Sequence, residues 1–314
     1  MLKKIFIVLW VLLVLAIGTL GYVFWAIFTG RLGYMPNIQQ LENPVDKFAS
    51  QVISSDGALL GTWSYTRANR IFVSYDDLPR PLIEALLATE DVRFYEHSGV
   101  DFRALTRAVV KRGLMGQKSA GGGSTITQQL AKQLYSSRAE DIRERVLQKP
   151  IEWAIAVKLE KYYTKEEIIT MYLNFFDFLH GAVGIKTAAK TYFGKEPKEL
   201  DVKECAMLVG LCKNPSYYNP VRQGERCLQR RNVVLSQMVK AGYLSEFEAQ
   251  DLMQQPLGLK VSRGDHKQGA GTYLRDYLRV VLMAKEPRRE DYASWQDQKY
   301  YEDSLAWKTD PLYG

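Results

Sequence analysis

The fold is decided by residues 82–99, LIEALLATEDVRFYEHSG. Apolar residues recur here at the spacing of one helix face: Leu82, Ile83, Leu86 and Leu87. The spacing predicts an amphipathic helix. Glu90 continues the apolar face, where a carboxylate must be paired, bound or protonated because burying a bare charge is costly. Such a group is suited to general acid or base chemistry. A solvated helix end is the alternative.

The composition is that of an ordinary globular protein. Of its residues, 46% are hydrophobic and 25% are charged. The length of 314 residues is enough for one large domain or two small ones. The formal net charge of +7 favours an anionic partner such as a phospholipid surface or a phosphorylated substrate. No sequence pattern of a nucleic-acid-binding module occurs, so we expect no nucleic-acid partner. The three cysteines lack metal-binding spacing, and we expect them to be buried.

The N-terminus departs from this globular pattern. Residues 5–30 contain no charged side chain, and this run is long enough to cross a bilayer core of about 30 Å. Lys3 and Lys4 precede it, so the positive-inside rule places the N-terminus in the cytoplasm and the later residues outside. A cleaved signal peptide is the alternative, but the run is too long for a usual h-region. We expect residues 1–30 to form a cytoplasmic tip and an uncleaved, single-pass anchor in the cytoplasmic (inner) membrane.

The remaining chain divides into three parts. Residues 31–50 are predicted to be a tether, residues 51–256 the main domain, and residues 257–314 a connection to a further domain. Short strands are expected on either side of the Asp56-Gly57 turn, with a third strand over residues 70–75. From there to about residue 255 the pattern is helical, so the sequence predicts a mainly α fold with a few short N-terminal strands.

A glycine-rich patch, AGGGS, ends at Ser124 and precedes a second candidate site. The next four residues have the form of a capping box, so a helix should begin near Thr125. Thr125, Gln128 and Lys132 share one face of that helix. Free N–H groups, a hydroxyl and a lysine at a helix N-terminus suit a phosphate. A flexible hinge before an ordinary surface helix is the alternative.

Glu152 is a second carboxylate on an apolar-leaning face. It follows Pro150, which we expect in the first turn of a helix, and lies three residues after Lys149. Paired carboxylates beside cations suit glycosyl transfer, in which one takes a proton and the other orients groups or stabilises charge. A surface Glu–Lys pair would produce the same pattern.

Five motifs in order resemble those of glycosyltransferase family 51. These are the peptidoglycan glycosyltransferases of class A penicillin-binding proteins and their monofunctional relatives. The motifs lie at residues 90–99, 123–129, 148–152, 165–174 and 206–220. The resemblance covers residues from about 54 to 256. Gln148 stands where the family has arginine, although Arg143 or Arg145 could supply the charge. Asp177, Leu179 and His180 lie where the family often has Tyr-Phe-Gly, which leaves the acceptor contacts open.

The resemblance implies a lysozyme-like domain with a small membrane-proximal jaw. It implies that the GlcNAc 4-hydroxyl of lipid II attacks C1 of the MurNAc of a lipid-linked growing glycan, with inversion and release of undecaprenyl pyrophosphate. Glu90 would be the general base, and Glu152 would assist the leaving group or a divalent ion, Mg²⁺ or Mn²⁺, which some members bind. The implied partners are lipid II, the growing glycan, the membrane and other cell-wall synthesis proteins. The substrate-binding residues implied by the motifs are Asp91, Phe94, His97, Ser124, Thr125, Gln128, Lys132, Lys149, Tyr172 and Asn174.

Two other classes of function stay open. A lysozyme-like glycoside hydrolase would use Glu90 as a general acid, and a non-catalytic cell-wall scaffold would use neither carboxylate. No S-x-x-K, S-x-N or K-T-G motif of a transpeptidase occurs among the 314 residues. The tail after Pro256 resembles the interdomain connection of class A proteins, so we expect the chain to be the N-terminal part of a bifunctional enzyme.

Overall fold

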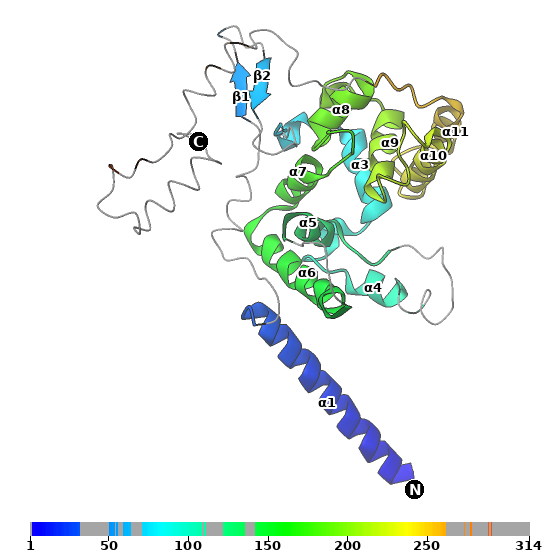
Figure 1. Ribbon diagram of the computed structural model, residues 1–314. Helices are drawn as coiled ribbons and strands as arrows, with labels where there is room; N and C mark the ends of the chain where they lie inside the picture. Colours follow the sequence, from blue (N-terminus) through cyan, green and yellow to red (C-terminus); the bar gives the residue numbers. More distant parts are fainter. Residues whose placement is uncertain are drawn as a thin grey trace.

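The computed structural model describes residues 2–31, 50–53, 59–63, 71–108, 122–135 and 142–261, with isolated positions 55, 110, 273, 277, 288 and 290. The described part is mainly α-helical, as the sequence predicts (Figure 1). The tether between its end residues 31 and 50, and nearly all of the predicted C-terminal connection, lie outside the described residues.

The helices are α1 (Leu2–Phe28), α3 (Arg80–Glu90), α4 (Phe102–Ala108), α5 (Ile126–Tyr135), α6 (Ile142–Tyr162), α7 (Lys165–Phe175), α8 (Ile185–Phe193), α9 (Val202–Cys212), α10 (Gly224–Lys240) and α11 (Glu246–Gln254). Short 3₁₀ turns lie at Tyr75–Asp77, Phe94–Glu96 and Pro197–Glu199.

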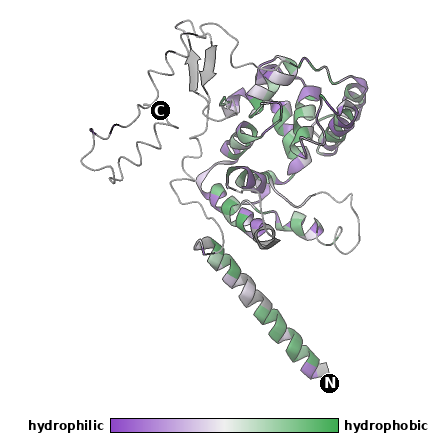
Figure 2. Cartoon of the chain, viewed as in Figure 1, coloured by the Kyte–Doolittle hydropathy of each residue, from purple (hydrophilic) through white to green (hydrophobic). Residues whose placement is uncertain are grey.

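Helix α1 projects away from the other helices and is apolar along most of its length (Figures 1 and 2). Its C-terminal end packs on α6, where the rings of Phe24 and Trp153 stack with centroids 6.5 Å apart. Ala26 and Ile27 are buried there. Among the residues described, no helix meets the combined length and hydropathy expected of a membrane-crossing segment.

Two strands lie where the sequence predicts a hairpin. β1 (Ser50–Ile53) pairs antiparallel with β2 (Leu59–Trp63). The third strand expected over residues 70–75 is wrong for the described residues 71–75, which belong to no strand. A side-chain amide takes the place of a strand partner there. The Val73 N–H donates to Asn174 Oδ1 at 3.0 Å, and Asn174 Nδ2 donates to the Val73 carbonyl at 2.8 Å.

Helix α6 runs without interruption through Pro150, so the prediction that a helix begins at Pro150 is wrong. The helix begins at Ile142 instead. An interior proline removes one backbone hydrogen bond and costs about 3 kcal/mol. Packing offsets that cost, because α6 contacts both α5 and α1 and buries Ile155 and Leu159 completely.

The hydrophobic core is built mainly from α3, α5, α7, α8, α9 and α10. α3 buries Leu82 and Leu86 completely, which confirms the apolar face predicted for it. Helix α9 is buried between α3 and α10. The cysteines are buried free thiols, as expected: Cys205, Cys212 and Cys227. This packing places the C-terminal end of α3, and therefore Glu90, against α5 and α10.

Candidate active site

Glu90 is the last residue of α3 and contacts side chains from two other helices. Gln129 Nε2 of α5 donates to Glu90 Oε2 at 2.9 Å. Arg230 Nη2 of α10 lies 3.5 Å from Glu90 Oε1. The Glu90 side chain is 14% exposed. The carboxylate on the apolar stripe is therefore paired, and it still reaches solvent.

Tyr172 determines which way the Gln129 amide points. Its hydroxyl donates to Gln129 Oε1 at 2.9 Å, so the amide nitrogen is the atom that faces Glu90. Burial, together with the nearby Cys212 and Glu90, raises the pKa of Tyr172 well above its usual range. The phenol therefore stays protonated and remains a donor. We call Tyr172, Gln129 and Glu90 the relay.

Arg230 is held in place by groups other than Glu90. Its Nε donates to the Gly210 carbonyl at 3.3 Å, and its guanidinium lies 5.9 Å from the centre of the Tyr218 ring. A Cβ at Gly210 would lie 3.2 Å from Arg230 Cγ, so the glycine makes room for the arginine stem. Arg230 is only 8% exposed. A planar cation with five donors is thus fixed beside one face of the carboxylate.

Sequence reasoning missed Gln129 and Arg230 as site residues. Gln129 belongs to the second motif, next to Gln128, and its place there was the available signal. Arg230 lies far from Glu90 in the sequence, on a helix that follows the last of the five motifs. The packing of α10 on α3 brings it to the site.

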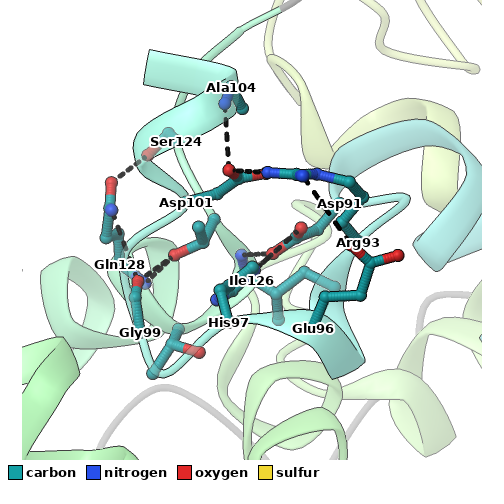
Figure 3. Close-up of polar contacts among 12 residues, drawn as sticks. Asp91, Arg93, Glu96, His97, Gly99, Asp101, Ala104, Ser124, Ile126 and Gln128 are labelled. Atoms are coloured by element: carbon teal, nitrogen blue, oxygen red, sulfur yellow. Dashed lines mark hydrogen bonds and ion pairs between the residues drawn. The ribbon is translucent and has the colours of Figure 1, made fainter. Parts of the chain in front are cut away.

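Asp91 clamps the end of α3 to the start of α5 (Figure 3). Its Oδ2 accepts the Ile126 N–H at 3.1 Å, and His97 Nε2 lies 3.1 Å from each carboxylate oxygen. Asp91 is 7% exposed. Both carboxylate oxygens of Asp91 are therefore engaged within the protein.

The Gly99 carbonyl accepts hydrogen bonds from two polar side chains at the start of α5 (Figure 3). It accepts from Thr125 Oγ1 at 2.6 Å and from Gln128 Nε2 at 3.3 Å. Thr125 Oγ1 in turn accepts the Gln128 N–H at 3.2 Å, which confirms the predicted helix start. Ser124 donates to Gln128 Oε1 at 3.2 Å. Gly99 has a φ of +89°, and a Cβ there would lie 2.8 Å from the Ala156 backbone.

The turn between α3 and α4 is fixed by two further clusters. Phe94 is fully buried, with Lys165 Nζ 4.2 Å from its ring centre and 2.7 Å from the His97 carbonyl. Asp101 accepts the Ala104 N–H at 2.9 Å and pairs with the Arg93 guanidinium (Figure 3). Burial alone would raise the pKa of Asp101, but these two partners lower it below its usual range. The turn that carries the first motif is therefore tied to the first residue of α7 and to the first turn of α4.

Glu152 and Lys149 form a separate group on α6. Lys149 Nζ lies 2.5 Å from Glu152 Oε2; the carboxylate side chain is 1% exposed and the lysine 55%. Lys132 is exposed on α5, whereas Thr125, just before α5, and Gln128 are buried against Gly99. The lysines, rather than the buried polar pair, are open to an anion.

The remaining sequence-predicted residues lie at the end of α7 and in the turn that follows it. Asn174 is buried and engaged with Val73, as described above. Leu179 and His180 both adopt positive φ, 68° and 55°, which is uncommon for residues other than glycine. His180 Nε2 lies 3.1 Å from Asn219 Oδ1, which ties this turn to the loop between α9 and α10.

The described residues contain no group of three or more His, Cys, Asp and Glu side chains that could hold a metal. Glu152 Oε2 is paired with the Lys149 ammonium group. The divalent-ion role of Glu152 stays a prediction, because Mg²⁺ commonly takes one or two protein carboxylates together with substrate phosphate oxygens.

Three comparisons identify similar proteins. A family model described as Transglycosylase matches residues 56–239. Penicillin-binding protein 1A of Aquifex aeolicus is 39% identical over 279 residues, covering 86% of this chain and 37% of that protein. Penicillin-binding protein 1F of Bacillus subtilis is 36% identical over 287 residues, covering 91% and 38%. The chain thus spans less than two fifths of the length of these curated relatives. A crystal structure of penicillin-binding protein 1A from Haemophilus influenzae matches over 75% of this chain and 24% of that chain, at 25% identity and with a TM-score of 0.37.

Proposed function

Because this chain belongs to the transglycosylase family and carries the glycosyltransferase domain of class A penicillin-binding proteins, we propose that it polymerises lipid II into β-1,4 glycan strands. The observation that carries the proposal is the relay, in which a largely buried carboxylate of the first motif is oriented by Gln129 and Tyr172. Such preorganisation is what a general base requires, because it must meet one particular hydroxyl proton.

In the proposed reaction, Glu90 accepts the proton of the GlcNAc 4-hydroxyl as that oxygen bonds to MurNAc C1. The bond from C1 to the pyrophosphate oxygen breaks with both electrons on oxygen, and the anomeric centre inverts. Gln129 and Arg230 each engage one Glu90 oxygen, so they fix the plane of the carboxylate. Catalysis by this route comes from orientation of the base rather than from new covalent chemistry on the protein.

We propose that Lys149 and Lys132 receive the leaving pyrophosphate. Both ammonium groups are exposed, and Lys149 is held by the buried Glu152 carboxylate. A cation aimed at the leaving group gains strength as negative charge develops there, which is the condition for raising kcat. Glu152 would then act by positioning Lys149.

We also propose that α1 attaches the domain to the cytoplasmic membrane, with the N-terminus inside and the catalytic domain outside. The large apolar side chains from Ile5 to Leu15 are 48–63% exposed, and a continuous apolar surface of this kind needs lipid or protein to cover it. A lipid-linked substrate makes lipid the consistent partner. A lysozyme-like fold with a membrane-proximal jaw belongs to the same proposal.

Product analysis tests the function directly. The full chain in detergent is incubated with lipid II, and the products are separated by size. The proposal predicts glycan polymer together with undecaprenyl pyrophosphate. Sugars released from preformed strands would indicate a glycoside hydrolase, and a lack of turnover would indicate a scaffold; either result would contradict the proposal.

A further inference from the structure

The loop between α9 and α10 and the first turn of α10 expose aromatic and cationic side chains together. Tyr217 is 50% exposed, and its ring meets that of Tyr218 edge to face at 4.9 Å. The Arg226 guanidinium lies 4.7 Å from the centre of the Tyr217 ring. Arg222 and Arg226 are both exposed. We call Tyr217, Tyr218, Arg222 and Arg226 the tyrosine–arginine platform.

The platform is linked to the proposed catalytic carboxylate by contacts between side chains. Tyr218 lies against Arg230, at 5.9 Å from guanidinium carbon to ring centre, and Arg230 lies 3.5 Å from Glu90. Two side chains therefore link Tyr217 to the site of chemistry. A substrate longer than one sugar unit must extend from Glu90 over a neighbouring surface, and the platform is such a surface.

The platform is also held in one conformation. Asn219 Oδ1 accepts the backbone N–H groups of Val221 at 3.0 Å and Arg222 at 3.1 Å. His180 Nε2 lies 3.1 Å from the same oxygen, and Asn219 is 6% exposed. The positive φ of His180 thus accompanies the contact of its side chain with this loop. A surface that is already ordered costs less conformational entropy when it binds.

The chemistry of the platform indicates its ligand. A tyrosine ring offers an apolar face to the C–H groups of a sugar and a hydroxyl to its polar groups. A guanidinium pairs with carboxylates through two parallel hydrogen bonds. We propose that the platform binds a saccharide chain whose substituents carry carboxylates. The inference rests on the proposed function, in which such a chain is the growing glycan. An anionic lipid headgroup would suit the arginines, but the side-chain link to Glu90 favours the saccharide.

Direct binding of two oligosaccharides tests the proposal. The probes are a neutral N-acetylglucosamine tetramer and a tetrasaccharide of the same length bearing carboxylate-containing peptides. Their affinities for the full chain in detergent are measured by titration calorimetry. Tyr217→Ala should weaken binding of both probes by roughly tenfold, because both lose the ring. Arg226→Gln should weaken only the charged probe, by roughly fivefold for an exposed ion pair.

Matched controls lie at the other end of α10. Tyr243 is 41% exposed and Lys240 is exposed, so Tyr243→Ala and Lys240→Gln remove a similar ring and a similar charge away from the platform. Both controls should bind each probe as the wild type does. Thermal melts establish that all four variants are folded.

Three results would overturn the proposal. Tyr217→Ala could bind both probes with wild-type affinity, or Arg226→Gln could change the two affinities equally. Alternatively, anionic vesicles could bind in a Tyr217-dependent manner while neither oligosaccharide binds, which would assign the surface to lipid. No turnover is involved in these titrations, so failure of the proposed function shows separately, in the lipid II product assay.

Discussion

Replacing Tyr172 with phenylalanine isolates the relay behind Glu90. The change removes a single oxygen, which donates to Gln129 Oε1 at 2.9 Å. A part-buried acceptor left without its donor costs about 1–3 kcal/mol, and the Gln129 amide is then free to turn away from Glu90. At about 1.4 kcal/mol for each factor of ten, kcat should fall roughly fivefold to a hundredfold. KM for lipid II should stay unchanged, because the change alters the orientation of the base through Gln129 and leaves the Glu90 carboxylate itself in place.

Tyr192→Phe is the matched control for this experiment. The Tyr192 side chain is fully buried, and its hydroxyl donates to the Phe178 carbonyl at 2.6 Å, outside the relay. Both variants should therefore lose a similar amount of stability in thermal melts, and only Tyr172→Phe should lose kcat in initial-rate polymerisation assays. Equal kcat values in the two variants would refute the reasoning that Tyr172 orients the base through Gln129.

Three further predictions follow from the same contacts. Asn174→Ala leaves the buried Val73 N–H and carbonyl without their side-chain partner, and chemical denaturation should show a loss of about 2–4 kcal/mol; a loss below about 0.5 kcal/mol would contradict this. The pKa of Asp101 is lowered in the folded protein, so its stabilisation is present above about pH 4 and is lost at lower pH; the Tm difference between wild type and Asp101→Asn should shrink on acidification, and a constant difference would contradict this. Lys149→Ala and Lys132→Ala should each lower kcat by roughly two to three orders of magnitude, and unchanged kcat in both would place the pyrophosphate elsewhere.

Local signals in the sequence predicted the parts of the site that neighbouring residues determine. The apolar spacing before Glu90 predicted helix α3 and its buried face, and Thr125 predicted the start of α5. Five ordered motifs then predicted the family. The predictions of α3 and of the start of α5 are confirmed because each depends on contacts within one or two helical turns.

Long-range contacts determine the parts that the sequence did not predict. Arg230 reaches Glu90 only because α10 packs on α3. The Asn174 side chain makes the hydrogen bonds to the Val73 backbone that a neighbouring strand would otherwise make. No local sequence pattern predicts this contact. Pro150 predicts the first turn of a helix, yet α6 continues on both sides of it because the helix is stabilised by tertiary packing. In each case the contacts that determine the local structure come from another helix or loop, so local sequence propensity predicts the structure wrongly or not at all.

The central claim is that Glu90 is the base of a glycan polymerase, and one comparison tests it most directly. Lipid II polymerisation is measured for wild type, Glu90→Gln and the control Glu84→Gln, whose carboxylate lies on the same helix and pairs with the exposed Arg80 at 2.6 Å. Glu90→Gln keeps the shape of the side chain and loses the base. Polymer formation should fall by roughly 10²–10⁴-fold in Glu90→Gln, while lipid II binding and the Glu84→Gln rate stay near wild type. Wild-type polymerisation by folded Glu90→Gln would contradict the account.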